Sequence, residues 1–261
     1  MAGSLDGEVL RAALVTPSSP WRDVEHHATI GSTNARAAWL GEPWRVVVAD
    51  HQSEGRGRLA RTWEAPPGTS VAVSATVPVP AEGPAWLPLL AGLAVAEAVE
   101  ATTGLTANLK WPNDVLLPDD GDRKVCGVLC EVMSGPGDPV VVVGAGINVD
   151  QDRAALPVET ATSLALAGAA TVDRNRLVAA YLSRFSSWYA ALTGGEAGRL
   201  RDAYRGRCGT VGRSVTLSRP SGPDVIGTAE SVDDDGRLVI AGPDGRRPWA
   251  AGDVTHVRSV G

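Results

Sequence analysis

Residues 139–148, PVVVVGAGIN, are the segment that most restricts the fold of this chain. Four consecutive valines leave no polar face, so they predict a strand that is covered on both sides at the centre of a sheet. Residues 69–77, TSVAVSATV, alternate at period two and predict a second strand. Shorter apolar runs predict further strands at 21–28, 45–50, 106–111 and 125–133.

Helical spacing of apolar residues and candidate caps predict helices between these strands. Helices are expected over 4–15, 86–104 and 173–206. A further helix is expected to begin at a cap at Ser32 or Thr33. After Gly209 the pattern changes to five short segments separated by turns rich in Pro, Gly and Asp, which is typical of a small antiparallel barrel. We therefore expect a large α/β domain over residues 1–209 and a small β-barrel domain over 210–261.

Composition excludes several classes of function. The net charge of -6 provides no basic face, so a nucleic-acid partner is not expected. The three cysteines, Cys126, Cys130 and Cys208, are odd in number and lack CxxC spacing, so we expect reduced thiols and assign no metal ligands. Neither a secretion signal nor an apolar stretch long enough to span a bilayer is apparent, so we expect a soluble cytoplasmic protein with no membrane partner.

Only two of the 24 basic residues are lysines, Lys110 and Lys124. Lysine is a compact point charge on a flexible stem, suited to reach a phosphate or carboxylate in a tight pocket. In LKWPNDVLL, Pro112 fixes the backbone, so that Lys110, Asn113 and Asp114 leave the end of a strand in defined directions. Together they suit a phosphate, a nucleotide hydroxyl and a metal ion. The alternative is an ordinary Pro-Asn-Asp turn.

A second cluster of charge lies in the polar loop after residue 50. In GRGRLAR, Arg56, Arg58 and Arg61 alternate with small residues, so dense positive charge lies on backbone that can approach a polyphosphate or acyl phosphate closely. Gln52 and Trp63 flank the run. Gln52 offers a polar amide and Trp63 an apolar ring, which favours a location of the run at the edge of a pocket. The alternative is a solvated loop with scattered surface charge.

Three other segments carry weaker signals. Lys124 opens an alternating strand, KVCGVLCE, in which Gly127 removes a side chain where a ligand can come close. GAGIN ends an apolar strand at Asn148, but a lone Gly-x-Gly without Rossmann spacing is weak evidence for a nucleotide. The expected helix cap can also present its side chains to a ligand: Ser32, Thr33 and Asn34.

Motifs for covalent catalysis are absent from the sequence. There is no G-x-S-x-G elbow, no HExxH and no phosphate loop of the G-x-x-x-x-G-K-[ST] type. The four histidines are adjacent or isolated, and we assign them no role.

Taken in order, the motifs GSTN, Q-x-x-GRGR-x-x-R-x-W, KWPND, K-x-x-G-x-L-x-E and GAGIN closely resemble biotin protein ligase. The resemblance extends to a GDV-x-H-x-R stretch near the C-terminus. It implies a central α/β (α+β) domain with a mixed sheet and packed helices, like class II synthetases and lipoyl ligases, followed by a small SH3-like barrel. It also implies an enzyme that uses ATP and Mg²⁺ to activate biotin and then biotinylates a lysine of a biotin carboxyl carrier domain.

The same resemblance assigns roles to individual residues. The biotin site would comprise Ser32, Thr33, Asn34, Gln52, Gly55, Arg56, Gly57, Arg58 and Lys124. The ATP site would comprise Arg61, Trp63, Lys110, Asn113, Asp114 and Asn148. The reacting groups would be served by Lys124, Arg58 and Asp114.

Two departures from the family pattern are visible. Family members usually have glycine where Ala60 stands, which bears on the flexibility of the arginine loop. About thirty residues precede GSTN, too few for a winged helix-turn-helix, so we expect the single-function form rather than a DNA-binding repressor. A lipoate ligase and a non-catalytic biotin-binding module are the alternatives.

Overall fold

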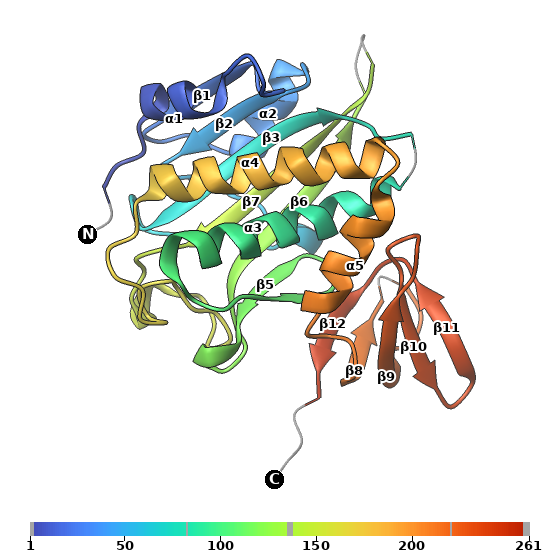
Figure 1. Ribbon diagram of the computed structural model, residues 1–261. Helices are drawn as coiled ribbons and strands as arrows, with labels where there is room; N and C mark the ends of the chain where they lie inside the picture. The colour runs from blue at the N-terminus through green and yellow to red at the C-terminus, as the bar shows by residue number, and fades with distance from the viewer. Residues whose placement is uncertain (1–2, 82, 135–137, 220, 258–261) are drawn as a thin grey trace.

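The computed structural model describes residues 3–81, 83–134, 138–219 and 221–257 (Figure 1). Within these residues seven strands form a mixed sheet in the order β1-β2-β3-β7-β6-β5-β4, in which only β1 and β2 run parallel. The strands are β1 (Asp23–His27), β2 (Arg45–Ala49), β3 (Ser70–Pro78), β4 (Asn108–Lys110), β5 (Asp114–Leu117), β6 (Arg123–Met133) and β7 (Val140–Asn148). The helices of this part are α1 (Gly7–Leu14), α2 (Thr33–Leu40), α3 (Leu87–Thr103), α4 (Arg174–Thr193) and α5 (Ala197–Arg207).

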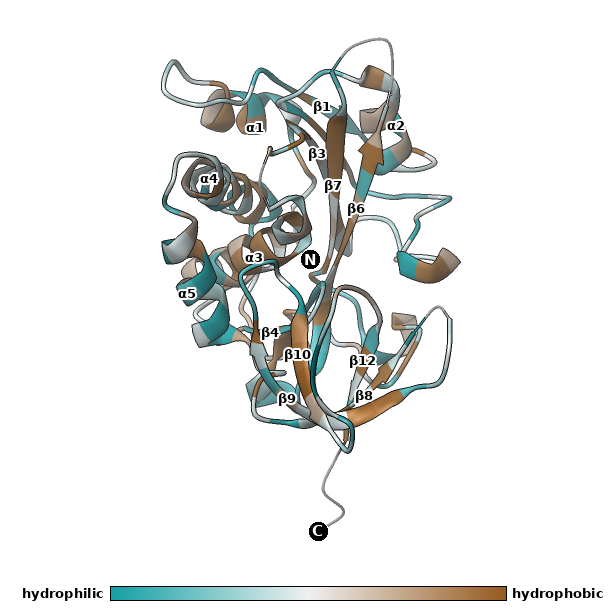
Figure 2. Cartoon of the chain, turned by 90° about the vertical axis from the view of Figure 1, so that its right-hand side faces the viewer, coloured by the Kyte–Doolittle hydropathy of each residue, from teal (hydrophilic) through white to brown (hydrophobic). Residues whose placement is uncertain are grey.

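The prediction for residues 139–148 is confirmed, because β7 is the middle strand of the sheet. It pairs along its whole length with β3 on one side, and from Val140 to Ile147 with β6 on the other. Helices α3 and α4 pack together over one face, whereas α2 lies on the opposite face (Figure 2). The valines of β7 are buried between these two layers.

Helix α3 is apolar on nearly every side, as expected for a helix that is covered by other elements. Contrary to the sequence expectation, Pro84–Thr103 has the length and hydropathy of a membrane span. Most of that segment is buried against α4 and the sheet, as in the core helix of a soluble protein.

Two predictions of secondary structure were wrong. The helix expected over 173–206 is divided into α4 and α5, because Gly194 and Gly195 follow each other and Gly195 has a φ of 86°. Strand β5 was not predicted, since its four residues follow the Pro-Asn-Asp turn directly and carry too short a pattern to recognise.

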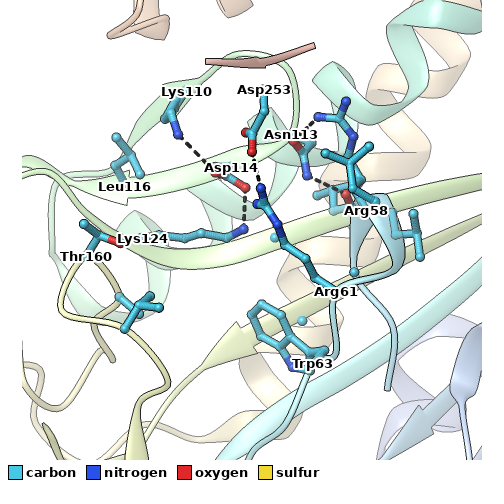
Figure 3. Close-up of a pocket in the computed structure, with 18 of the residues that line it drawn as sticks. Arg58, Arg61, Trp63, Lys110, Asn113, Asp114, Leu116, Lys124, Thr160 and Asp253 are labelled. Atoms are coloured by element: carbon cyan, nitrogen blue, oxygen red, sulfur yellow. Dashed lines mark hydrogen bonds and ion pairs between the residues drawn. The ribbon is translucent and has the colours of Figure 1, made fainter. Parts of the chain in front are cut away.

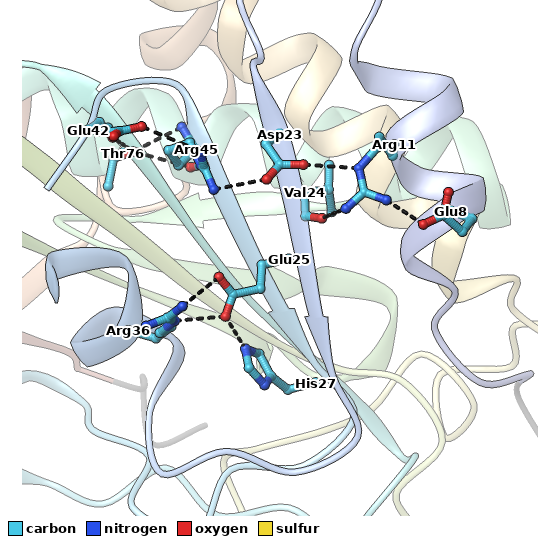
Figure 4. Close-up of polar contacts among 10 residues, drawn as sticks. All are labelled: Glu8, Arg11, Asp23, Val24, Glu25, His27, Arg36, Glu42, Arg45 and Thr76. Atoms are coloured by element: carbon cyan, nitrogen blue, oxygen red, sulfur yellow. Dashed lines mark hydrogen bonds and ion pairs between the residues drawn. The ribbon is translucent and has the colours of Figure 1, made fainter. Parts of the chain in front are cut away.

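Strand β1 forms one edge of the sheet and is held by charged side chains (Figure 4). Arg11 of α1 donates to Asp23 Oδ1 at 3.0 Å and to the Val24 carbonyl at 2.7 Å. Arg36 of α2 donates to both carboxylate oxygens of Glu25, and this hydrogen bonding lowers the pKa of Glu25 below its usual value. One outer carbonyl of the edge strand is therefore occupied by Arg11, which limits pairing with another chain.

The five strands expected after Gly209 are all present and form an antiparallel sheet in the order β11-β10-β9-β8-β12. They are β8 (Ser214–Ser218), β9 (Val225–Val232), β10 (Leu238–Gly242), β11 (Gly245–Trp249) and β12 (Asp253–His256). The last residue of the GDV-x-H-x-R stretch, Arg258, lies outside the described residues.

Two buried tryptophans attach this C-terminal sheet to the larger part. Trp111 donates its indole N–H to the Gly236 carbonyl at 2.9 Å, and Trp86 donates to the Asp234 carbonyl at 2.8 Å. The backbone N–H of Trp111 also donates to Thr210 Oγ1 at 3.1 Å. The turn between β9 and β10 is thus fixed to the end of β4 and the start of α3.

We predict that Trp111→Phe lowers the free energy of unfolding by about 1–3 kcal/mol, because it leaves the buried Gly236 carbonyl without its donor. Chemical denaturation measures the change. Trp39→Phe is the control, since Trp39 is 74% exposed and the substitution should change stability by less than about 0.5 kcal/mol. Equal stability of the two variants would show that the indole hydrogen bond contributes nothing.

Candidate functional site

One cavity of about 1350 Å³ brings the predicted site residues together. It lies between strands β6 and β7, the loop that carries the three arginines, and the C-terminal sheet. Every residue nominated from the sequence lines it except Gly55: Ser32, Thr33, Asn34, Gln52, Arg56, Gly57, Arg58, Arg61, Trp63, Lys110, Asn113, Asp114, Lys124 and Asn148.

Three glycines on the central strands make room for this cavity. A Cβ on Gly146 would lie 2.4 Å from the ring of Trp63, and one on Gly144 would lie 2.1 Å from Asn34 Oδ1. A Cβ on Gly127 would lie 2.9 Å from Lys124 Nζ. Any larger residue at 144 or 146 would therefore displace the side chain that lies against the strand.

Gly55 has a different part in the site. A Cβ there would lie 2.2 Å from the carbonyl oxygen of Trp63, so position 55 has no space for a side chain. The N–H of Trp63 donates to the Gly55 carbonyl at 2.9 Å, and the N–H of Gly57 donates to the Arg61 carbonyl at 2.7 Å. The arginine loop, residues 51–68, therefore folds back on itself, and Gly55 shapes it from outside the cavity.

A buried hydrogen-bond network fixes the side chains of Thr33 and Asn34 in the GSTN motif. Both the backbone N–H and the hydroxyl of Thr33 donate to Gln52 Oε1, at 2.8 and 2.9 Å. Asn34 donates from Nδ2 to Glu131 Oε2 at 2.7 Å, while its Oδ1 accepts from the Ser74 hydroxyl at 2.6 Å. The orientation of the Asn34 amide is therefore determined from both ends.

Ser74 and Glu131 were not nominated from the sequence. Ser74 is a fully buried residue in the middle of β3, where the sequence gives no sign that its hydroxyl faces Asn34. Glu131 stands in the K-x-x-G-x-L-x-E motif, so the motif was the available signal. Ser32 has the expected role of a helix cap, since its hydroxyl accepts from the N–H of Ala35 at 3.4 Å.

The two lysines meet at a single carboxylate (Figure 3). Asp114 Oδ1 lies 2.6 Å from Lys124 Nζ, in a direction that makes an ion pair but no regular hydrogen bond. Asp114 Oδ2 lies 3.6 Å from Lys110 Nζ, and the Asp114 side chain is 14% exposed. One carboxylate thus lies between two ammonium groups, as expected for a site that exchanges this contact for the anion of a ligand.

Arg58 and Arg61 connect the arginine loop to the C-terminal sheet. Arg58 donates to Asn113 Oδ1 at 2.8 Å and to the Gly252 carbonyl at 3.1 Å. Arg61 pairs with Asp253 at the start of β12 (Figure 3). Both arginines therefore join the arginine loop to the C-terminal sheet, whereas Arg56 extends toward Glu131, 3.9 Å away.

Ala60, which departs from the family pattern, has a φ of 57°, and Leu59 before it has a φ of 56°. This left-handed region costs a residue with a side chain about 1–2 kcal/mol relative to the right-handed one, whereas glycine adopts it freely. The backbone therefore gives a physical reason why glycine suits position 60.

His256 of β12 and Arg213, just before β8, are among the residues of the C-terminal part that line the cavity and were not nominated. His256 accepts at Nδ1 from Arg213, 3.4 Å away, and its Nε2 lies 3.1 Å from Thr210 Oγ1. Burial and the neighbouring charges of Arg213 and Lys110 lower the pKa of His256 to about 4, so the ring is neutral near pH 7. Arg213 is itself paired with Asp122 at 2.6 Å.

Asn148 lies at the end of β7, with both ends of its amide bonded to the protein. Its Nδ2 donates to the Thr162 carbonyl at 2.9 Å, and its Oδ1 accepts from Gln151 at 2.9 Å. Trp63 differs, because its buried indole N–H donates to no atom of the described residues. Asn148 therefore shapes the wall of the cavity, and the Trp63 ring lies against Gly146.

Comparison with known proteins decides the family. The Biotin/lipoate A/B protein ligase family matches residues 30–148, and the Biotin protein ligase C terminal domain matches residues 210–257. A biotin--[acetyl-CoA-carboxylase] ligase of Mycobacterium tuberculosis is 38% identical, over 97% of this chain and 96% of that protein. The chain belongs to the biotin protein ligase family.

Other members of the family give the same picture. A biotin--[acetyl-CoA-carboxylase] ligase of Paracoccus denitrificans is 33% identical, over 87% of this chain and 98% of that protein. The structure of a biotin protein ligase from Aquifex aeolicus in complex with biotin and ATP is 28% identical, with a TM-score of 0.77, and is covered completely. The bifunctional ligase/repressor of Bacillus subtilis is 32% identical, but this chain matches only 72% of its length. This chain is thus similar to the two biotin--[acetyl-CoA-carboxylase] ligases over nearly their whole length, and to the bifunctional ligase/repressor over part of its length.

Gly127, Gly144 and Gly146 form a row of glycines on β6 and β7, called here the glycine row. Its role can be tested at Gly146. We predict that Gly146→Ala weakens ATP binding at least tenfold, because the added methyl group displaces the Trp63 ring from β7. Isothermal titration calorimetry measures the affinity. Gly198→Ala in α5 is the control, since nothing lies within 4 Å of a Cβ there. Unchanged binding by Gly146→Ala would show that Trp63 is not a wall of the ATP site.

Proposed function

We propose that this protein activates biotin with ATP to biotinyl-5'-AMP and then transfers biotin to a lysine of a biotin carboxyl carrier domain. The observation that carries the proposal is the convergence of both lysines and the arginine loop on one cavity. The names of the relatives and the biotin and ATP in the Aquifex aeolicus structure support the choice of substrates.

In the first step a biotin carboxylate oxygen attacks the α-phosphorus of ATP. A carbon–oxygen–phosphorus anhydride forms, the bond to the β-phosphate breaks, and diphosphate leaves. Both reactants are anions, so Coulomb repulsion opposes their approach. Within the described residues six basic side chains and four carboxylates line the cavity, although the whole chain has a net charge of -6. This local excess of positive charge favours the meeting of the two anions.

Each group of residues has a part in this scheme. Thr33, Asn34 and Gln52, with Ser32 at the helix cap, receive the polar head group of biotin at the end of the network that Ser74 and Glu131 hold. Arg56, Gly57 and Arg58 of the loop cover the acid and the adenylate, as the family resemblance implies. Lys124 exchanges its contact with Asp114 for the reacting carboxylate and phosphate.

The nucleotide is served by a second group of residues that line the same cavity. Lys110 and Asn113 lie next to the Asp114 carboxylate, Trp63 supplies an aromatic wall, and Arg61 adds charge at the rim. Asn148 shapes the adenine side of the wall. Most of the rate enhancement then comes from positioning and charge, with no covalent intermediate on a side chain.

Mg²⁺ fits this donor set as an ion carried by the nucleotide. The described residues contain no group of three or more His, Cys, Asp or Glu that can hold a metal. Mg²⁺ bound with phosphates needs only one or two protein oxygens, and Asp114 and Asn113 offer them. When bound, the ion would neutralise charge on the departing diphosphate.

In the second step the ε-amine of the acceptor lysine attacks the acyl carbon of biotinyl-5'-AMP. An amide bond forms, the bond to the phosphate oxygen breaks, AMP leaves, and the amine loses a proton to solvent. The arginine loop must shield the anhydride from water until the acceptor arrives.

We further propose that residues 1–209 and 210–261 are separate domains and that the protein works in the cytoplasm.

Lipoate ligation is the second candidate, because the matching family description includes lipoate ligases. The match of residues 210–257 to the biotin-specific C-terminal domain favours biotin. A competition assay with both acids and Mg-ATP separates the two. A non-catalytic biotin-binding module would bind biotin without consuming ATP when an acceptor domain is added.

The direct test is mass spectrometry of purified protein incubated with biotin and Mg-ATP. We expect biotinyl-5'-AMP and diphosphate in the absence of acceptor, and AMP with biotinylated acceptor once a carrier domain is added. Protein that binds biotin but forms no adenylate would refute the proposed activity.

A substitution at Lys124 tests how charge is used. We predict that Lys124→Arg slows adenylate formation at least a hundredfold although it retains the charge, because Nζ lies close beside Gly127, where a guanidinium does not fit. Single-turnover formation of biotinyl-5'-AMP measures the rate. Arg184→Lys, at a largely exposed position of α4, is the control. A wild-type rate for Lys124→Arg would show that the shape of this cation is irrelevant.

A further inference from the structure

Among the described residues, the most deeply buried charged side chain lies outside the cavity. Arg174, the first residue of α4, is 2% exposed and is not among the residues that line the site. Burying a guanidinium is costly unless every part of it is paired. An apolar side chain would fill the same space at lower cost, so the contacts of Arg174 need an explanation.

Arg174 uses three nitrogens to bind three separate segments. Its NH2 lies 2.6 Å from Asp50 Oδ1, its NH1 donates to the Ser70 carbonyl at 3.0 Å, and its Nε donates to the Gly3 carbonyl at 2.9 Å. Asp50 is also bound by the backbone N–H of Leu5, at 3.2 Å. A single planar group therefore joins α4, the N-terminal segment and both strands that flank the arginine loop.

The two acceptors on the sheet mark the ends of that loop. Asp50 follows the last residue of β2, and Ser70 is the first residue of β3. The N–H of Gly68 donates to the Asp50 carbonyl at 3.0 Å and closes the loop at its base. Two residues after Asp50, Gln52 accepts both hydrogen bonds from Thr33.

At its C-terminal end, the base of the arginine loop contacts the residues that follow β7, on the other side of the cavity. The carbonyl of Thr69 accepts from the N–H groups of Val149 and Asp150, at 3.0 and 2.8 Å. These residues directly follow Asn148 at the end of β7. A shift of the loop base would therefore move Gln52 on one side and the end of β7 on the other.

We propose that Arg174 is a positioning residue for substrate binding: by binding Asp50 and Ser70 together, it fixes the base of the arginine loop, and through it Gln52 and the loop arginines. Arg174 touches no substrate and acts only through the loop. The proposal rests on the proposed function, since biotin is the ligand used to measure it. It extends that function to a residue that no motif of the site contains.

Arg174→Lys is the informative variant. Lysine keeps the positive charge beside Asp50, but its single nitrogen cannot reach Asp50, Ser70 and Gly3 at once. If the loop base is correctly placed in only a fraction of molecules, the apparent Kd rises by the inverse of that fraction. We expect Arg174→Lys to raise the Kd and KM for biotin at least tenfold and to change kcat at saturating biotin less than threefold.

A merely structural role gives a different result. Partial unfolding would reduce the active fraction, and so kcat, without changing KM. Arg184→Lys on the same helix is the matched control, because Arg184 is 58% exposed and lies 3.8 Å from Glu97. It should leave Kd, KM and kcat unchanged. If Arg174→Lys does not fold, Asp50→Asn tests the same junction with the volume of the acceptor retained.

Limited proteolysis with trypsin gives a readout that needs no substrate. The loop contains cleavage sites after Arg56, Arg58 and Arg61. Below the unfolding transition, we expect Arg174→Lys to be cut in this loop at least fivefold faster than the wild type and the Arg184→Lys control.

The outcomes separate the two proposals. Wild-type biotin affinity and wild-type loop cleavage in Arg174→Lys would overturn the role of Arg174. Suppose instead that the loop of Arg174→Lys is cut faster than that of the wild type, but the wild type forms no biotinyl-adenylate. This result would support the positioning role of Arg174 and refute the proposed function.

Discussion

The site depends on the absence of side chains at three positions of the two central strands. Where Gly144 and Gly146 stand on β7, the nearest atoms of Asn34 and Trp63 leave no space for even a methyl group. Gly127 on the neighbouring β6 provides similar space beside Lys124. The strands can carry these glycines because valines on the rest of β7 bury the sheet between two layers of helices. Packing of the core thus supports a hollow at one end of the same strands.

The positively charged side chains of the cavity are held in place by partners within the protein. Asp114 lies between Lys110 and Lys124, while Arg58 and Arg61 are held by groups of the C-terminal sheet. Each cation therefore has a partner that an anionic ligand can replace, which keeps the groups in place at little cost in reorganisation. The contacts of Arg58 and Arg61 also explain why the small sheet belongs to the site, since it supports the loop that covers the cavity.

Much of the fold and the site was predictable from local sequence. The four valines of β7 determined the centre of the sheet, and the order of the motifs brought together nearly all the residues that line the cavity. Ser74 and Arg174 were not predictable, because their significance lies in contacts with residues 40 and more than 100 positions away in the chain. The break between α4 and α5 was missed although Gly194 and Gly195 signal it, and β5 is too short to carry a pattern.

The central claim is that a single cavity holds the acid and the nucleotide against the glycine row. A crystal structure of the protein with biotinyl-5'-AMP tests it most directly. The expected complex has the biotin head group beside Thr33 and Asn34, the acyl phosphate within hydrogen-bond distance of Lys124 Nζ, and the Trp63 ring still lying over Gly146. Adenylate bound elsewhere, or bound here with Lys124 still paired only to Asp114, would contradict the claim.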